Sequence, residues 1–369
     1  MIIKNLSLKN FRNYSKLDIS FNDKLNIIIG NNAQGKTNIL ESIYYLSITK
    51  SFLSASDKNI MRREEVFTSL DAKIKTDNKI KNINIILNEL GKKLTINNKE
   101  IKKHSEFIGN LKVIVFSPDN LRIIKEGPGN RRKFLNIEIS QLYERYINLL
   151  NEFNVILRQR NEYLKIIKSG KYNLDYFSIL NDKFISLSVE IYQYRNNFIN
   201  LINKYITNIF RKISDYDGLY LDYITNVDID DYDKIYENMK NKLDNAFDRE
   251  VVYGSSLIGP HRDDFGFKLA NNDLLLYGSQ GQLKMAILSL KLAEIDVFNE
   301  ICGENPVLLL DDLFSELDIE KRNRVINYLD RDIQTIVTTT DLNNIDSKFI
   351  ENSYIYKIED GAVIYKNSD

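Results

Sequence analysis

The sequence of 369 residues is poor in cysteine and histidine, with only Cys302, His104 and His261. A single cysteine excludes a disulfide framework, and so few thiol and imidazole groups exclude a zinc site of the usual kind. No stretch approaches the roughly twenty apolar residues of a membrane-spanning helix. Charged residues also interrupt the amino terminus before a signal peptide can form. We therefore expect a cytoplasmic protein with no membrane partner.

An excess of charge of one sign is also missing, since 51 basic residues balance 51 acidic ones. Any contact with DNA must therefore come from a local patch. Residues 71–103 contain nine lysines against four acidic residues, a local net charge of +5. Lysines neutralise phosphates without reading bases, so the expected binding to DNA is sequence-independent. The alternative is that these lysines only form the solvent-exposed faces of strands. The DNA-binding candidates are Lys92, Lys93, Lys102, Lys103, Arg62 and Arg63, with Arg131, Arg132 and Lys133 as further candidates.

Glycine and proline are scarce in the middle of the chain, where residues 130–214 contain only Gly170 and no proline. Apolar residues recur there at three- and four-residue steps, which predicts two long antiparallel helices with a turn at 168–173. Each arm of roughly 40 residues would reach about 60 Å. We expect this helical arm to interrupt a nucleotide-binding domain.

Both flanks of the helical region predict alternating strands and helices. Expected strands are 2–8, 16–20, 25–29, 219–224, 307–310 and 335–338, and a β-rich lobe at 71–117 includes 83–87 and 113–116. Expected helices are 35–48, 231–245, 281–299 and 318–329. We predict three domains: 1–125 with the β-rich lobe, 126–250 as the helical arm, and 251–369 as the second half of the nucleotide domain.

A phosphate-binding loop follows the predicted strand 25–29. Gly30-Asn31-Asn32-Ala33-Gln34-Gly35-Lys36-Thr37 matches G-x-x-x-x-G-K-[ST] between a strand and a helix, as the motif requires. Its backbone N–H groups and the helix N-terminus can bind phosphate oxygens, and Lys36 adds a positive charge. Thr37 supplies a hydroxyl to Mg²⁺, and Asn38 continues the loop. The motif predicts binding of ATP and Mg²⁺.

A second carboxylate site follows the apolar run 306–310. Asp311 and Asp312 end this run, as in a Walker B segment. Asp311 would hold Mg²⁺, and Asp312 would act as general base for the attacking water. Many ABC ATPases carry glutamate at the second position, so the shorter Asp312 predicts slow turnover. Lys36, Asp311 and Asp312 are therefore the catalytic candidates.

A third segment, Gly278-Ser279-Gln280-Gly281-Gln282, opens a predicted helix. Alone it reads equally well as an ordinary helix cap. The order of P-loop, this signature, Walker B and then Ser315-Glu316-Leu317-Asp318 is, however, that of ABC-type ATPases, in which the signature of one subunit covers ATP held by another. One chain with one P-loop and one signature cannot complete this arrangement, so we expect an ATP-dependent homodimer.

Several further motifs occur in an order that resembles the RecF family, bacterial DNA replication and repair proteins related to the SMC ATPases. They are Asn10-Phe11-Arg12-Asn13-Tyr14, Lys50-Ser51-Phe52, Phe116-Ser117-Pro118, Gly127-Pro128 with Arg131-Arg132, and Gly259-Pro260-His261-Arg262-Asp263-Asp264. The resemblance implies an α/β fold, with an ABC-type P-loop ATPase head, a β-rich lobe and a helical insertion that forms a lever arm. It also implies weak, DNA-stimulated ATP hydrolysis in recombinational repair, recognition of gapped DNA, and help in loading RecA with RecO and RecR.

The same resemblance assigns roles to individual residues. Arg12 would lie near the nucleotide, and Ser279, Gly281 and Gln282 would reach the γ-phosphate across a dimer. Thr340 would take the place of the switch histidine of ABC transporters. For His261 and Arg262 a purely structural role beside Asp263 and Asp264 remains an alternative.

Two other functions stay open at this level. The chain could be the ATPase subunit of a membrane transporter, although the long helices and Thr340 argue against it. It could also be a scaffold in which ATP joins two copies without being hydrolysed. Hydrolysis measurements on an Asp312 variant would separate the enzyme from the scaffold.

Overall fold

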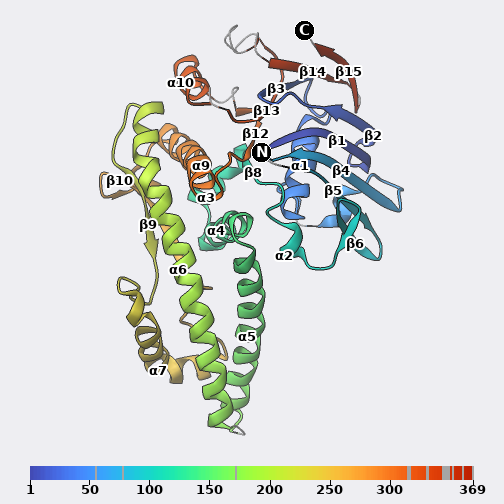
Figure 1. The fold of residues 1–369 in the computed structure, drawn as a ribbon. Helices are drawn as coiled ribbons and strands as arrows, with labels where there is room; N and C mark the ends of the chain where they lie inside the picture. Colours follow the sequence, from blue (N-terminus) through green and yellow to red (C-terminus); the bar gives the residue numbers. More distant parts are fainter. Residues whose placement is uncertain are drawn as a thin grey trace. The chain divides into compact units, whose positions relative to one another are not determined.

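Two compact units make up the chain in the computed structural model. The model describes residues 1–54, 56–76, 79–170, 173–313, 317–329, 332–342, 350, 353–359 and 361–367. The first unit comprises residues 1–121, 208–216 and 284–369, and the second comprises 122–207 and 217–283. The first unit thus draws on both ends of the sequence, which the colours of Figure 1 make visible. This arrangement confirms the predicted α/β fold with a helical insertion.

The first sheet of unit 1 is antiparallel throughout. Its strand order is β2-β1-β4-β5-β6-β7. Side chains of β1 and β4 alternate between buried and exposed, because successive residues of a strand point to opposite faces. The strands are β1 (Ile2–Phe11), β2 (Tyr14–Ser20), β4 (Phe67–Lys75), β5 (Ile80–Asn88), β6 (Gly91–Ile96) and β7 (Lys99–Ile101).

The second sheet of unit 1 has the order β15-β14-β3-β13-β12-β8, and its interior strands pair in parallel. Strands of such sheets are buried on both faces, which explains the continuous apolar runs in the sequence. The strands are β3 (Leu25–Ile29), β8 (Val113–Phe116), β12 (Val307–Asp311), β13 (Thr335–Thr339), β14 (Ser353–Glu359) and β15 (Ala362–Asn367). Residues 113–116, predicted to belong to the β-rich lobe, instead pair with β12 in this sheet.

Helix α1 (Lys36–Ile48) contacts strands of both sheets of unit 1 (Figure 1). Its apolar residues are therefore buried on all sides, and Ile39, Leu40 and Ile43 have no exposed surface. The other helical segments of the unit are η1 (Asp57–Ile60), α2 (His104–Phe107), η2 (Pro118–Leu121), α10 (Ile319–Leu329) and most of α9 (Gln280–Cys302). Asp311 and Thr338, near the carboxyl ends of β12 and β13, line one cavity with Lys36 and Thr37 at the start of α1, which positions the candidate site.

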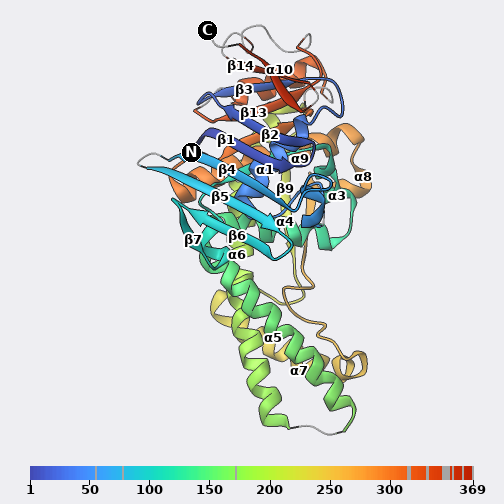
Figure 2. The ribbon, with the colours of Figure 1, turned by 90° about the vertical axis from the view of Figure 1, so that its right-hand side faces the viewer.

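Unit 2 contains the predicted antiparallel arm, in which α5 and α6 run side by side (Figures 1 and 2). Phe153 of α5 stacks on Phe184 of α6 with ring centroids 5.4 Å apart. A buried ion pair between Arg160 and Glu250 joins α5 to α7 at 2.6 Å. The helices are α3 (Arg122–Lys125), α4 (Pro128–Leu142), α5 (Glu144–Lys168), most of α6 (Leu174–Ile213), η3 (Tyr232–Lys234), α7 (Ile235–Tyr253) and α8 (Leu274–Tyr277).

A small sheet completes unit 2, with β9 (Leu219–Ile224), β10 (Asp264–Leu269) and β11 (Asn272–Asp273) in the order β11-β10-β9. Because β10 pairs with β9, residues 251–283 pack in unit 2, whereas the predicted boundaries grouped them with the carboxyl-terminal half. The first predicted arm helix is also wrong in its length. It is divided into α4 and α5 at Tyr143, whose backbone is extended, and no glycine or proline marks this break.

Candidate nucleotide site and signature

The P-loop lies between β3 and α1, and two of its glycines are required by close approaches. A Cβ atom at Gly30 would lie 2.5 Å from the carbonyl oxygen of Ile358. Gly35 has a φ of +106°, and a Cβ there would lie 2.5 Å from Nδ2 of Asn13. Only glycine satisfies both the left-handed backbone and the missing space. The predicted turn is thus formed as the motif requires.

Lys36 points its amino group back into the loop. Its Nζ donates to the carbonyl oxygens of Gly30 at 2.6 Å and Asn31 at 2.8 Å. Burial lowers the pKa of Lys36, and the nearby Asp312 and Asp311 carboxylates oppose this change. The loop therefore holds a cationic donor close to the carbonyls that line it.

Asp311 is the centre of a hydrogen-bonded group at the end of β12. Its Oδ1 accepts from the hydroxyls of Thr37 and Thr338, each at 2.8 Å. Burial raises the pKa of Asp311, while the two hydroxyl hydrogen bonds act in the opposite direction. Thr338 also accepts from the backbone N–H of Asp312 at 3.0 Å. Asp312 adopts a φ of +49°, an uncommon conformation for a residue other than glycine that clusters at functional sites.

These residues line one cavity of 300 Å³ in unit 1. Its walls are formed by Asn32, Ala33, Gly35, Lys36, Thr37, Asn38, Pro118, Asp311, Asp312 and Thr338. Over the part of the chain that the structure describes, no group of three or more His, Cys, Asp or Glu side chains could hold a metal. The pair of a threonine hydroxyl and a carboxylate instead suits Mg²⁺, which keeps several waters and takes its other oxygens from substrate phosphates.

The β1–β2 turn supports the P-loop through residues next to Arg12. Nδ2 of Asn13 donates to the carbonyl oxygen of Gln34 at 3.0 Å, and the hydroxyl of Tyr14 donates to that of Gly35 at 3.0 Å. Arg12 itself is bound by Glu41 of α1, with Nε donating to Oε2 at 2.7 Å. The arginine predicted to lie near the nucleotide is therefore tied to the helix that begins at the P-loop.

The signature forms a capping box at the start of α9. The backbone N–H of Gln282 donates to Oγ of Ser279 at 3.2 Å, and the N–H of Ser279 donates to Oε1 of Gln282 at 2.8 Å. Ser279, Gln280 and Gly281 are exposed. The sequence left an ordinary cap and a phosphate donor as alternatives. The geometry shows the cap, and the hydroxyl hydrogen of Ser279 is still able to donate outward.

Comparisons with known proteins agree with this geometry. Residues 2–362 match a family model described as the RecF/RecN/SMC N terminal domain. The chain is 41% identical over 367 residues to the DNA replication and repair protein RecF of Clostridium botulinum, covering 98% of this chain and 99% of that protein. The chain belongs to the RecF family. It is also 37% identical over 368 residues to the RecF protein of Halalkalibacterium halodurans, covering 98% of this chain and 99% of that protein.

Solved structures extend the RecF comparison to three dimensions. The recombination mediator protein RecF with ATP, described for the RecFOR pathway, superimposes with a TM-score of 0.91 at 32% identity, over all of this chain and 98% of that one. An SMC head domain superimposes with a TM-score of 0.57 at 16% identity, over all of this chain and 98% of that one, which shows the fold alone. In the described part of the chain, no helix is both long and apolar enough to cross a membrane.

The DNA-binding candidates of this RecF-family chain differ in their surroundings. Lys92 is only 13% exposed, forms an ion pair with Asp57 at 2.9 Å and lies over the ring of Tyr45. Lys93 is exposed and lies 3.5 Å from Glu100, whereas Lys102 and Lys103 are exposed on the segment before α2. The structure thus gives Lys92 a packing role that the sequence did not reveal.

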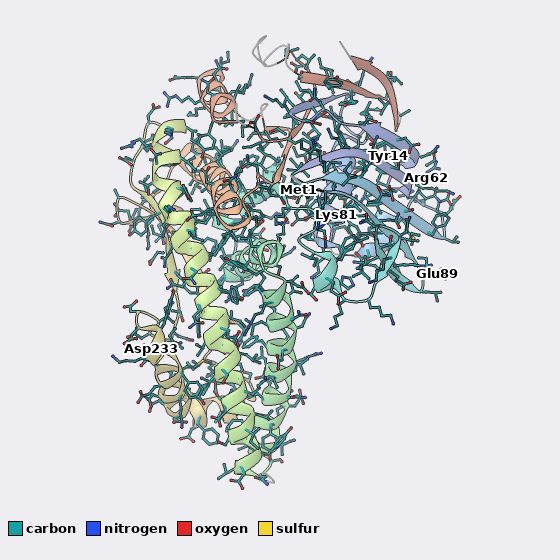
Figure 3. All side chains as sticks on the ribbon, viewed as in Figure 1. Met1, Tyr14, Arg62, Lys81, Glu89 and Asp233 are labelled. Atoms are coloured by element: carbon teal, nitrogen blue, oxygen red, sulfur yellow. The ribbon has the colours of Figure 1, made fainter. Side chains whose placement is uncertain are left out.

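Arg62 and Arg63 are exposed and line a cavity of 510 Å³ together with Arg12 and Lys58. Backbone hydrogen bonds join this segment to the β1–β2 turn, from the N–H of Arg62 to Asn10 and from that of Arg12 to Ile60. Arg62 and Tyr14, which follows this turn, both belong to unit 1 and are labelled in Figure 3. These arginines therefore lie beside the turn that supports the P-loop, and the nucleotide becomes a second candidate ligand beside DNA.

Arg131 and Arg132, the remaining arginine candidates, are bound within unit 2. Arg131 forms an ion pair with Asp264 at 2.5 Å, and Arg132 donates to the carbonyl oxygen of Asp263 at 2.7 Å. His261 and Arg262 both contact the carbonyl oxygen of Ser256. The two residues thus contact Ser256, whereas Asp263 and Asp264 are bound by Arg195 and Arg131. A purely structural role for His261 and Arg262 stays a prediction.

Sequence reasoning missed Thr338, which contacts both Walker B aspartates and lines the cavity. The sequence signal for Thr338 was the presence of three threonines in an otherwise apolar five-residue strand, Thr335–Thr339. Asn13 and Tyr14 were noted for the resemblance without a role at the P-loop. Thr340 follows β13 and stays a prediction, while Ser315 and Glu316 lie outside the described residues.

Proposed function

We propose that the chain is a slow ATPase of recombinational repair that forms an ATP-dependent homodimer on DNA. One observation carries the proposal: Lys36, Thr37, Asp311 and Asp312 line the same cavity. The names of its relatives, and the RecF structure with ATP described for the RecFOR pathway, support it. RecO and RecR as partners, and help in loading RecA, are part of this proposal.

ATP binding follows from the cavity's donors. The N–H groups of the loop and the N-terminus of α1 hold the phosphates. Lys36 exchanges its carbonyl partners for β- and γ-phosphate oxygens, which bear a full negative charge. Thr37 and Asp311 would hold Mg²⁺, which supplies neutralisation of the phosphate charge.

Hydrolysis requires a base for the attacking water, and Asp312, which lines the cavity with Lys36 and Asp311, would take this role. Asp312 accepts a proton from water as the water oxygen bonds to the γ-phosphorus. The bond from that phosphorus to the bridging oxygen breaks, and ADP leaves with the bridging oxygen. The short aspartate side chain gives slow turnover, which we expect DNA to stimulate.

A second copy completes the site through its signature. Ser279 caps α9, and Gly281 and Gln282 lie in its first turn, where a hydroxyl and the helix N-terminus favour an anion. The copy that binds ATP in its P-loop would receive these donors from the other copy. ATP thus joins two chains, and its hydrolysis separates them.

Asp312→Asn tests the enzymatic part of the proposal. Asparagine keeps the size of the side chain but accepts a proton poorly, so we expect phosphate release to fall at least about 100-fold. ATP-dependent dimers should persist, as measured by light scattering. Equal and negligible phosphate release by both proteins would leave a scaffold in which ATP is not hydrolysed.

Lys102→Glu with Lys103→Glu tests the DNA-binding surface. Both side chains are exposed, so reversal should weaken binding to gapped duplex DNA without changing the fold. Losing two phosphate contacts lowers the slope of log affinity against log salt by about 2. Lys92 is left out of this variant, because a glutamate there would face Asp57. An unchanged slope would move the DNA contact to another surface.

Arg62→Ala with Arg63→Ala separates the two possible ligands of that cavity. Loss of DNA affinity at unchanged ATP affinity would support the predicted DNA contact. Loss of ATP affinity would instead assign both arginines to the nucleotide, beside Arg12.

A further inference from the structure

Three large apolar side chains are exposed immediately before the signature. In α8, Leu275 is 45% exposed, Leu276 72% and Tyr277 76%. A single exposed leucine on a protein surface is ordinary, but a contiguous apolar patch commonly marks an interaction site. We refer to Leu275, Leu276 and Tyr277 as the apolar step.

The apolar step is held in a fixed position next to Ser279. Asp273 caps α8, with Oδ1 accepting from the N–H of Leu275 at 2.9 Å, and Leu274 is buried beneath it. The N–H of Gly278 donates to the carbonyl oxygen of Leu274 at 2.9 Å, and a Cβ at Gly278 would lie 2.5 Å from that oxygen. The capping box of Ser279 follows directly. Two caps and one tight turn therefore fix the step relative to the signature.

We propose that the apolar step packs against a second copy of this chain when ATP joins the two copies. This inference rests on the proposed function, in which Ser279 donates to a triphosphate held by the other copy. Any surface that Ser279 reaches must also come close to Tyr277, two positions earlier in the same rigid segment. A different macromolecule seated on the step would cover Ser279 and block that contact, which favours the second copy.

An apolar contact between the two copies would not depend on the γ-phosphate, as the contacts of Ser279 to phosphate do. Hydrogen bonds to phosphate vanish when the γ-phosphate leaves, whereas apolar burial depends only on the two protein surfaces. The unit that carries the P-loop offers an apolar counterpart in Ile319, which is 68% exposed at the start of α10, shortly after Asp312. The step would thus set how tightly two ATP-bound copies associate, without contributing to ATP binding itself.

The first test replaces Leu276 and Tyr277 by serine in the Asp312→Asn chain, whose dimers are not lost to hydrolysis. We expect unchanged ATP affinity and a rise of at least about tenfold in the protein concentration needed for half dimerisation by light scattering, equivalent to roughly 1.4 kcal/mol. The matched control is Leu90→Ser, because Leu90 is 97% exposed on the turn between β5 and β6. Dimerisation at the concentration of the Asp312→Asn parent would overturn the inference.

A second measurement follows the step directly. In a Cys302→Ser background, Tyr277→Cys introduces the only cysteine, and its reaction rate with a maleimide reports exposure. ATP should slow this reaction at concentrations where the protein dimerises, but should leave Leu90→Cys unaffected. If the Tyr277→Cys chain itself dimerises with ATP and yet its thiol reacts equally fast with and without ATP, the inference fails while the proposed dimer stands. A parent that remains monomeric with ATP would overturn the proposed function itself.

Discussion

The P-loop cavity and the signature are both suited to phosphate, yet they are built in opposite ways. In the cavity, polar side chains are bonded to one another, as the hydroxyls of Thr37 and Thr338 are to the carboxylate of Asp311. In the signature, Ser279 and Gln282 cap their own helix, and Ser279 and Gly281 are exposed. The cavity is thus held together by its own hydrogen bonds, whereas the signature is an exposed surface.

This difference predicts two separable classes of variant. Truncating one group in the cavity leaves buried polar partners unsatisfied, which costs far more than the loss of the bond itself. A substitution in the exposed signature leaves the fold intact and acts only on whatever approaches that surface. Variants of the cavity should therefore impair ATP binding, and variants of the signature should impair dimerisation alone.

Lys36→Met should have the largest effect, because it removes the only side-chain cation of the motif. Loss of one buried charge contact costs roughly 3 kcal/mol, so ATP affinity should fall about 100-fold and ATP-dependent dimers should disappear. Fluorescent-nucleotide titration and light scattering measure the two effects. Dimers that persist at unchanged ATP affinity would contradict the assignment of the loop and remove the contrast with the signature.

Ser279→Arg should abolish dimers while ATP affinity stays unchanged, because its bulk blocks the phosphate of the other copy. Ser279→Asp is the sharper variant, since aspartate caps a helix as well as serine does but repels phosphate. Both variants should therefore fold normally by circular dichroism and remain monomeric with ATP. Normal dimers from Ser279→Asp would show that Ser279 acts only as a helix cap.

Sequence reasoning located the cavity because its parts are local motifs. The glycines of the P-loop and the acids after an apolar strand can be recognised from short stretches of sequence. Both lie where predicted, at strand ends beside α1. The role of Thr338 could not be predicted from the sequence because it depends on β13 lying beside β12, a pairing that joins distant segments. The same holds for Lys92, whose partner Asp57 lies on another part of the chain.

The helical arm shows the other limit of the sequence. Periodicity predicted long helices correctly for α5 and α6, but the break at Tyr143 carries no glycine or proline. There the backbone is extended, and Tyr143 packs on Tyr194 with ring centroids 5.1 Å apart. Tertiary packing of this kind overrides local propensity and leaves no local pattern in the sequence.

Thr338→Val should have the smallest of these effects and tests how far the cavity depends on its internal bonds. Valine keeps the shape and suits a strand, but Asp311 loses a hydroxyl donor and the N–H of Asp312 loses its acceptor. A loss of about 1.4 kcal/mol would raise the Mg²⁺ concentration for half-maximal hydrolysis about tenfold. Thr335→Val on the same strand is the control, because among the residues that the structure describes its hydroxyl bonds to the carbonyl oxygen of Ile333 and to neither aspartate. If both variants respond alike to Mg²⁺, the bonds around Asp311 do not organise the metal site, and the cavity is no better prepared than the exposed signature.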